Sequence, residues 1–285
     1  MATTQQIEAT IKEYQSLNLS SVIDYEKYRL YSIVTGSTAL EGSTLTDLDT
    51  QLLLDEGITA KGKPIEHHLM VQDNYNAMKE VLRLADLKTP ITKDVLIAIN
   101  GLNMKNTGKI VNSALGTVDG TTGAFRKVQV HSEALGYYLA PTKVPAAMDE
   151  FCRDLQQQML QKLSPAEVLT LSFTTQAKLI IIHPWQDGNK RTSRLVSNYI
   201  QRYFGIPLGK LNKEDSNEYL TCLHEFKYNE NIEPFCSFMQ TKYVEMLKQE
   251  ITDFKQGQKW DLPKILPNKP TNKPIQAKKK RGMRL

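Results

Sequence analysis

Residues 179–194 read LIIIHPWQDGNKRTSR, and this stretch decides the expected fold. The apolar run before the histidine is continuous, which is typical of a helix that is buried on all sides. Residues 164–167, SPAE, form a capping box with proline in the first turn, so this helix should begin there. A tight polar loop should follow, and then a helix from about Asn189 to Tyr203 that Gly205 closes. The sequence therefore predicts two central helices joined by a short loop.

The polar loop gathers the residue types that phosphate chemistry needs. Free N–H groups at a helix N-terminus form an anion site, and Arg191 and Arg194 lie three residues apart on one face beside it. Two arginines in this place favour a polyphosphate. Asp187 is a hard oxygen ligand suited to Mg²⁺, and His183 is a candidate general base near the phosphate. Together these residues indicate nucleotide-dependent group transfer.

Helical patterns dominate the rest of the chain as well. Residues 5–17 look like a polar, exposed helix, and Asp24 should cap a helix that reaches about Glu41. Further helices are expected over residues 46–57, 64 to about 82, 92–102, 145 onward, 213–228 and 232–250.

Only one β-hairpin is expected. Residues 128–131 alternate in the period of a strand, and residues 136–140, ended by Pro141, are the expected partner. Residues 106–124 are rich in glycine, serine, threonine and asparagine and are expected to be loop. The expected fold class is all-α, a mainly helical bundle with one short β-hairpin flap.

Composition excludes several classes of protein. No apolar run approaches the ~20 residues of a membrane span, and the N-terminus lacks the basic and apolar regions of a secretion signal. The three cysteines, Cys152, Cys222 and Cys236, form no C-x-x-C pair, which argues against a disulfide scaffold or zinc site. We therefore expect a cytoplasmic protein with no membrane partner.

The net charge of +5 does not describe the body of the chain. From Lys255 onward the chain carries ten Lys or Arg and one acid, which leaves a balance of −4 on the first 254 residues. This basic tail also holds four of the twelve prolines and the run KKKR at 278–281, so it should be disordered. A nucleic-acid partner is therefore not expected.

The polar loop also resembles the signature of the Fic (filamentation induced by cAMP) family, H-x-F-x-D/E-G-N-G-R-x-x-R. Residues 183–194 stand here as HPWQDGNKRTSR, with Trp185 in place of phenylalanine and Lys190 in place of glycine. Residues 123–126, GAFR, and the hairpin after them resemble the family too. Residues 37–42, STALEG, match its inhibitory pattern S/T-x-x-x-E-G/N, which in one class of the family precedes the core.

The resemblance implies a compact helical enzyme that uses ATP and Mg²⁺ to transfer AMP to a hydroxyl of a protein target. In that role His183 takes the proton from the Ser, Thr or Tyr hydroxyl, and Asp187 holds Mg²⁺ on the phosphates. Phosphate contacts are implied for Gly188, Asn189, Arg191 (β-phosphate) and Arg194 (γ-phosphate). Lys190 departs from the family glycine, but its side chain adds a cation that is suited to phosphate.

The resemblance also implies regulation and target docking. Glu41 would pair with Arg194 and keep it from the γ-phosphate, so Ser37, Glu41 and Gly42 would form the inhibitory motif. The hairpin would pin the target by strand addition, and its docking residues would be Val128, Gln129, Val130 and His131.

Alternatives to AMP transfer stay open. Lys190 gives the N-K-R ending of the related Doc (death-on-curing) toxins, so a Doc-like kinase that transfers the γ-phosphate is one alternative. A non-catalytic nucleotide-binding regulator is another. For organisation, we expect N-terminal helices including the inhibitory helix in residues 1–60, a catalytic core in 61–250 and the disordered basic tail in 251–285. A homodimer is left open.

Overall fold

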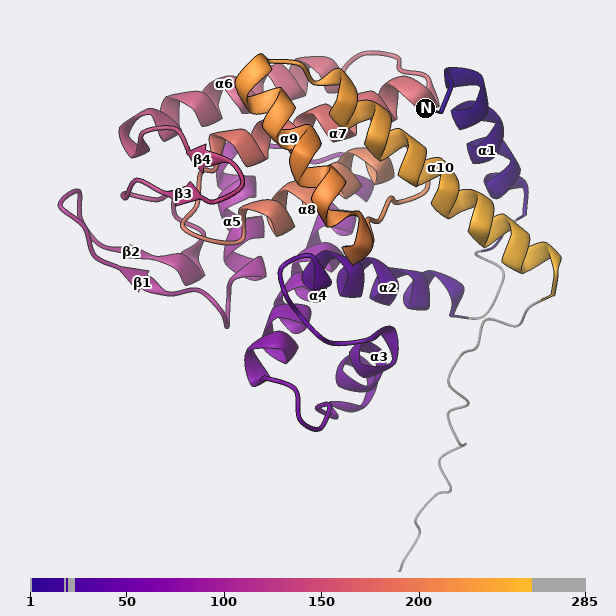
Figure 1. Ribbon diagram of the computed structural model, residues 1–285, viewed down its shortest axis with the longest axis horizontal. Coiled ribbons are helices and arrows are strands. Elements are labelled where there is room, and N and C mark those ends of the chain that lie inside the picture. Colours follow the sequence, from indigo (N-terminus) through magenta and orange to yellow (C-terminus); the bar gives the residue numbers. More distant parts are fainter. Residues whose placement is uncertain (1, 18, 20–23, 258–285) are drawn as a thin grey trace, which may run out of the picture.

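The computed structural model describes residues 2–17, 19 and 24–257. Residues 258–285, which hold most of the expected basic tail, lie outside the described residues. Helices account for most of the described chain (Figure 1). The helices are α1 (Thr4–Ser16), α2 (Tyr25–Ala39), α3 (Asp47–Glu56), α4 (Ile65–Asp86), α5 (Lys93–Asn103), α6 (Val144–Met159), α7 (Pro165–Ile182), α8 (Asn189–Tyr203), α9 (Ser216–Asn229) and α10 (Glu233–Lys255). The fold class is all-α, as the sequence predicts.

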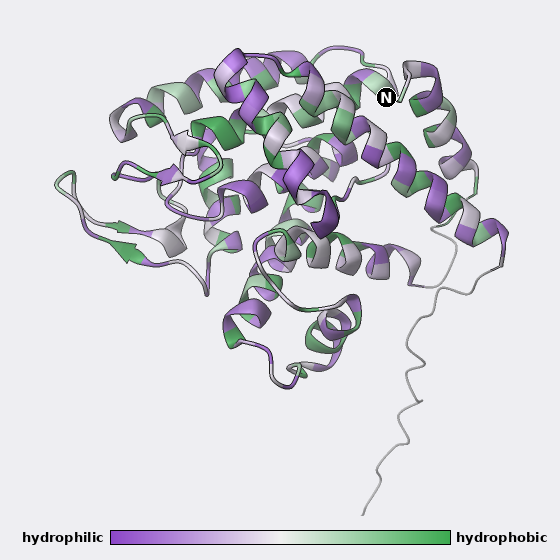
Figure 2. Cartoon of the chain, viewed as in Figure 1, coloured by the Kyte–Doolittle hydropathy of each residue, from purple (hydrophilic) through white to green (hydrophobic). Residues whose placement is uncertain are grey.

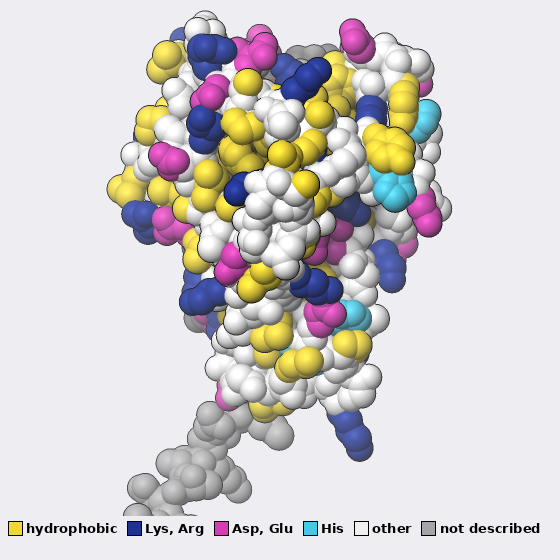
Figure 3. Space-filling view, turned by 90° about the vertical axis from the view of Figure 1, so that its left-hand side faces the viewer, with side chains coloured by type: hydrophobic (Ala, Val, Ile, Leu, Met, Phe, Trp, Pro, Cys, Tyr) yellow, Lys and Arg dark blue, Asp and Glu magenta, His cyan; other side chains and the backbone are white. Residues whose placement is uncertain are grey.

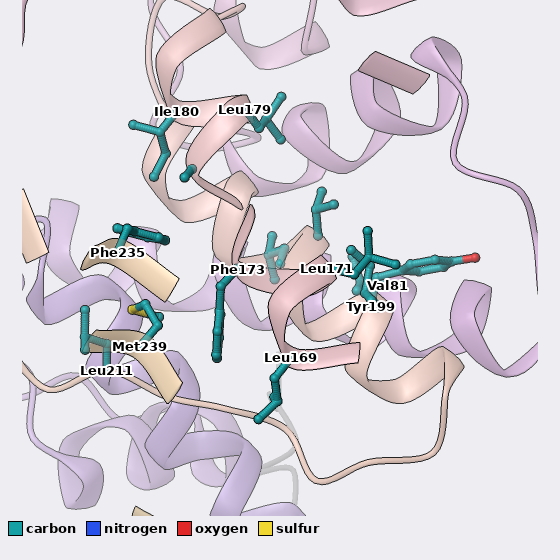
Figure 4. Close-up of a cluster of buried hydrophobic side chains, with 14 of the residues drawn as sticks. Val81, Leu169, Leu171, Phe173, Leu179, Ile180, Tyr199, Leu211, Phe235 and Met239 are labelled. Atoms are coloured by element: carbon teal, nitrogen blue, oxygen red, sulfur yellow. The ribbon is translucent and has the colours of Figure 1, made fainter. Parts of the chain in front are cut away.

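The centre of the molecule is the pair α7 and α8, with α4 on the other side of α8. Helix α7 begins at the predicted capping box, where the Ser164 N–H donates to the Glu167 carboxylate at 2.7 Å. Leu179 and Ile180 at its end are fully buried among side chains from several helices (Figure 4). Figure 2 shows hydrophobic residues along this central helix and hydrophilic ones on the outer helices. The continuous apolar run was therefore a sound sign of a central helix.

Helix α8 is as enclosed as α7, although its sequence is polar. Its buried polar side chains find partners on neighbouring helices. Thr192, for example, accepts hydrogen bonds from Asn100 at 3.0 Å and Asn103 at 3.2 Å, both on α5. Buried polar groups are tolerated only when they are hydrogen-bonded, so this network fixes α8 in one position.

The N-terminal helices pack onto this centre. Helix α2 lies along α4 and its end reaches α8, while α1 packs against α10 and α7. Helix α1 is not the exposed helix that the sequence suggested, because Ile7 and Ile11 on one face are buried in the core. Asp24 does precede α2, but its φ is 62° and its side chain makes no capping bond, so the predicted cap is wrong. Backbone in that left-handed conformation does not aim the carboxylate at the first turn.

The described residues form two short antiparallel hairpins instead of one (Figure 1). The first, β1 (Ile110–Val111) with β2 (Val118–Asp119), lies in the stretch expected to be loop. The second pairs β3 (His131–Ser132) with β4 (Gly136–Tyr137), so the predicted strand is shifted toward the turn. Outside these pairs, a side chain supplies a hydrogen bond between the two arms of the hairpin: Gln129 Nε2 donates to the Tyr138 carbonyl at 2.8 Å.

The C-terminal helix continues past the expected start of the tail. Helix α10 ends at Lys255, whose ammonium lies 2.5 Å from Glu13 on α1. Residues 251–255 therefore belong to the helical body. Among the described residues, no helix is long and apolar enough to cross a bilayer.

Candidate active site

His183 lies where α7 ends, with its backbone in the left-handed region at φ 52°. Its imidazole Nδ1 is 3.3 Å from the Ile180 carbonyl oxygen, which can only accept, so Nδ1 carries the proton. The lone pair is therefore on Nε2. Burial is the main cause that lowers the pKa of His183 to about 4, so the ring is neutral at pH 7. A neutral imidazole with a free Nε2 can act as a general base.

The hairpin reaches the imidazole through Tyr138. The two rings are stacked, with centroids 3.7 Å apart and planes at 22°. The Lys227 ammonium of α9 lies 4.6 Å from the Tyr138 ring centre. Sequence reasoning treated Tyr138 as packing, and no pattern in the chain indicates that it covers one face of His183.

The loop after His183 is closed by its own side chains. Trp185 is only 1% exposed, and its indole N–H donates to the Gly123 carbonyl at 2.8 Å. The Asn189 amide accepts from the Trp185 N–H at 3.0 Å and donates to the Trp185 carbonyl at 2.9 Å. Since the side chain of Asn189 is used in this way, Asn189 can offer an anion only its main-chain N–H.

The start of α8 has no side-chain cap on its helical N–H groups, while the Gly188 N–H just before it donates to the Asp187 carboxylate at 2.5 Å. Gly188 precedes the helix with φ 78°, and no side chain caps the first turn. A Cβ at Gly188 would come within 2.7 Å of Met104 Sδ and 2.9 Å of Asn100 Nδ2, so only glycine fits without displacement. Uncapped N–H groups at a helix start are a ready anion site.

Asp187 and Arg191 lie beside this helix start. The Asp187 side chain is 72% exposed and lies 3.7 Å from Arg191 Nη2. Arg191 is buried, with its guanidinium 3.2 Å from Met104 Sδ and 3.5 Å from the Asn103 carbonyl. Asp187 also borders a hollow of about 190 Å³ between α5, the first hairpin and the loop. One exposed carboxylate fits Mg²⁺, which binds through one or two carboxylates plus phosphates. In the described part of the chain, no three His, Cys, Asp or Glu side chains gather as a complete metal site.

Glu41 at the end of α2 holds two cations of α8. Its Oε1 is 2.8 Å from Arg194 Nη2, and its Oε2 is 2.9 Å from Lys190 Nζ. Burial alone would raise the pKa of Glu41, but the charges of Arg194 and Lys190 outweigh it and hold the pKa below its usual value. Arg194 also donates to the Ser37 hydroxyl at 2.9 Å and the Ser37 carbonyl at 2.7 Å. Gly42, at φ 97°, then turns the chain away from α2.

The second hairpin exposes the side chains of His131 and Tyr137 to solvent. Tyr137 is exposed, and its ring centre lies 5.4 Å from that of His131. Val130 is partly buried against the core, and its carbonyl accepts from the Tyr138 N–H at 3.1 Å. Figure 3 shows this side of the molecule, where hydrophobic side chains are grouped across the upper half with single basic ones among them. The hairpin that carries the expected docking residues thus reaches His183 through Tyr138, whose ring is stacked on the imidazole.

Arg126 is the residue of this region that sequence reasoning missed. Its side chain is buried, and Nε donates to the His183 carbonyl at 2.7 Å. In the sequence, Arg126 stands only as the last residue of the family-like stretch GAFR, with no role assigned to it, and because arginine is mostly exposed, composition does not indicate its burial.

This chain is similar to known proteins of one family. Residues 90–201 match the model of a family described as "Fic/DOC family". The protein adenylyltransferase Fic of Drosophila yakuba is 29% identical over 218 residues, which cover 75% of this chain and 40% of that protein. The protein of the same name from Drosophila melanogaster gives the same identity and coverage. This chain thus spans about two fifths of the length of these curated relatives.

Two solved structures share the fold. A Fic domain containing signalling protein from Bacteroides thetaiotaomicron has a TM-score of 0.75 at 21% identity and covers 88% of this chain and 98% of its own. Fic-1 from C. elegans, residues 134–508, has a TM-score of 0.68 at 21% identity and covers 87% and 70%.

Proposed function

Because this chain belongs to the Fic family, we propose that it is a protein adenylyltransferase, which transfers AMP from ATP to a hydroxyl of a protein target. The observation that carries the proposal is the neutral His183, with a free Nε2, six residues before the uncapped N-terminus of α8. In this proposal His183 is the base, and the adjacent start of α8, with Arg191 and Arg194 in its first turns, binds the phosphates. The names of the curated relatives, protein adenylyltransferase Fic, support the same reaction.

In the proposed reaction, His183 Nε2 takes the proton from the target's Ser, Thr or Tyr hydroxyl. The hydroxyl oxygen attacks the α-phosphorus, the bond to the β-phosphate oxygen breaks, and pyrophosphate leaves. The N–H groups of Gly188 and Asn189 would hold developing charge on the α-phosphate. Arg191 would bind the β-phosphate and Arg194 the γ-phosphate. The hairpin would hold the target through Val128, Gln129, Val130 and His131 by main-chain pairing.

We further propose Mg²⁺ as the cofactor. Asp187 would hold the ion together with the phosphates. When bound, Mg²⁺ would neutralise charge on the phosphate oxygens. A cytoplasmic location remains a prediction of the sequence, which leaves a homodimer open.

Glu41 is proposed as an inhibitor of this reaction. It occupies Arg194 and Lys190, the two cations that a terminal phosphate would need. Residues 1–60 would then form the regulatory segment on a catalytic core of residues 61–250. A glutamate in this place keeps ATP out of the productive pose until α2 moves.

Labelled ATP tests the reaction. The chain and its Glu41→Gly variant are incubated with Mg²⁺ and either α-labelled or γ-labelled ATP, with the chain itself and a cell extract as acceptors. AMP transfer leaves α-label on protein, more with Glu41→Gly, and His183→Ala removes it. If only γ-label is transferred, the reaction is the Doc-like phosphate transfer that Lys190 keeps open. ATP binding by calorimetry without transfer of either label would indicate a non-catalytic regulator.

A further inference from the structure

Arg126 is a buried cation without a carboxylate partner. Its side chain is only 2% exposed, and none of the ion pairs of the described residues includes it. Burial lowers the pKa of its guanidinium. Taking a charge out of water is costly unless other groups compensate for the lost hydration. A feature this costly needs a physical reason.

Three main-chain carbonyls compensate for that cost. Nε donates to the His183 carbonyl at 2.7 Å, Nη1 donates to the Val128 carbonyl at 2.8 Å, and Nη2 donates to the Leu139 carbonyl. The Arg126 backbone N–H adds a bond to the Pro184 carbonyl at 2.9 Å. The planar guanidinium donates from three separate nitrogens and so spans carbonyls that lie apart, whereas a lysine ammonium has all three of its donors on one nitrogen.

These carbonyls belong to the hairpin and to His183, which must be aligned with each other if the hairpin holds the target. Val128 lies three residues before β3, and Leu139 lies two residues after β4, so Arg126 holds both ends of the hairpin. The third carbonyl belongs to His183. Tyr138, the neighbour of Leu139, is stacked on the His183 ring at 3.7 Å.

We propose that Arg126 is a positioning residue, which fixes the β3–β4 hairpin and His183 relative to each other through three main-chain carbonyls. Its importance for catalysis rests on the proposed function. If the hairpin holds the target segment, Arg126 sets the position of the target hydroxyl against the base. It touches no residue proposed to bind phosphate, so it should act on the transfer step and leave ATP binding unchanged.

Hydrogen exchange tests the mechanical part of the proposal. In the full chain, Arg126→Met should raise amide exchange over residues 127–140 by about tenfold or more, because bonds to a charged donor are strong. Helices α7 and α8 should keep their protection. Arg202→Met, at an exposed arginine paired with Asp86, is the control and should leave the hairpin unchanged. Unchanged hairpin exchange in Arg126→Met, or equal loss of protection in every helix, would overturn the proposal.

Kinetics tests the catalytic part, in a chain that carries Glu41→Gly. Arg126→Met should lower kcat for α-label transfer by about 10²-fold, the cost of a small misplacement, and leave KM for ATP within about twofold. Arg126→Lys should stay defective, since it keeps the charge but not the fork. Full activity in Arg126→Lys, or a raised KM for ATP at unchanged kcat, would refute the positioning role.

The two proposals fail in different ways. If the Glu41→Gly parent transfers no label, the proposed function fails, and the exchange result still decides whether Arg126 holds the hairpin. The histidine NMR signals give a second readout that needs no turnover. Arg126→Met should shift the signal assigned to His183 and leave that of His67, which bonds Thr44 far from the hairpin, in place. An unchanged His183 signal would contradict the proposal.

Discussion

At the scale of single residues, the site contains one carboxylate that pairs with two cations and one histidine that is held neutral. Glu41 divides one carboxylate between two cations, while His183 remains neutral because burial lowers its pKa. Both states can be changed by one substitution or by pH. Substitutions of His183 and Glu41 and of their neighbours therefore give the sharpest tests of the proposed general base and the proposed inhibitor.

His183 should make the stability of the chain depend on pH in mild acid. Its pKa is about 4 in the folded chain against an ordinary value of 6.5, so the unfolded chain binds more protons between these values. The contribution of neutral His183 to the free energy of unfolding is complete above pH 6.5 and is lost as the pH falls toward 4. His183→Gln should reduce this loss, measured as unfolding free energy in urea across that window. His224→Gln on α9 is the control, and a parental slope in His183→Gln would contradict the prediction.

Lys190 should have opposite effects in two backgrounds. In the parent chain, Lys190→Met removes one of the two cations that hold Glu41, so basal transfer should rise. In the Glu41→Gly chain, the same change removes a cation that is proposed to bind phosphate, so KM for ATP should rise. Each effect should be about two- to fivefold, because Lys190 is 35% exposed and such pairs contribute about 0.2–1 kcal/mol.

The measurement for Lys190 is initial rate against ATP concentration in all four chains. Lys178→Met, at an exposed lysine on α7, serves as the matched control and should change neither value. If Lys190→Met lowered the transfer rate in both backgrounds, Lys190 would act only on folding or only on ATP binding, and not on the Glu41 contact.

At the scale of elements, turn and loop geometry fix the start of α8. Gly123 has φ 71°, and its carbonyl accepts the Trp185 indole N–H, so a loop before the hairpin supports the loop after His183. The two loops are far apart in sequence but depend on each other. Changes in one should therefore reach the other.

Gly123→Ala should weaken both stability and nucleotide binding. Its Cβ would lie 2.0 Å from the Ile97 carbonyl oxygen, a clash with backbone that no side-chain rotation relieves. We expect a loss of about 1–3 kcal/mol in unfolding free energy, and weaker ATP binding by calorimetry because Trp185 loses its support. Gly57→Ala, also at positive φ but with open space around its Cβ, is the control. Equal effects of the two changes would show that backbone strain, and not the clash, dominates.

Elements were predictable from the sequence where one local signal decides them. The capping boxes at Thr46 and Ser164 start α3 and α7 as expected, because the side chain and backbone that bond are three residues apart. The hairpin was misplaced because Gln129 and Arg126 supply bonds that a strand pattern assigns to backbone. Side-chain bonds over long range leave no period in the sequence.

The residues of the site that lie in one stretch of sequence were predictable, but the side chains from other segments that hold them in place were not. The loop of residues 183–194 carries its chemistry in adjacent positions, and the structure also brings Glu41 to 2.8 Å from Arg194. The burial of Arg126 and the stacking of Tyr138 on His183 were not predictable. Both depend on where separate segments meet, and nothing in a local stretch of sequence records that.

At the scale of the whole molecule, α2 connects the proposed inhibitor to the C-terminal helix. Arg29 on α2 lies 3.0 Å from Glu250 on α10, and it also donates to the Leu208 carbonyl at 2.6 Å. Tyr25 donates to the same Glu250 carboxylate at 2.7 Å. Because Glu41 lies two residues after α2, we expect its position to depend on these contacts at the other end of the helix.

Arg29→Met should destabilise the chain and also raise its basal activity. The change leaves the Glu250 carboxylate buried without its cation, and breaking such a pair costs about 3–5 kcal/mol. Because α2 loses its anchor, the Glu41 contact with Arg194 should open more often and α-label transfer should increase. Urea denaturation measures the first effect and initial rate the second. In a chain that already carries Glu41→Gly, Arg29→Met should lower stability without raising the rate.

The matched control is Arg83→Met, at an exposed arginine that pairs with Glu80 within α4. Exposed pairs one turn apart contribute little, so neither stability nor rate should change measurably. If Arg29→Met destabilised the chain and the rate stayed at the parental level, α2 would hold Glu41 in place without α10. Inhibition would then be a local property of residues 37–42 and their contacts with α8.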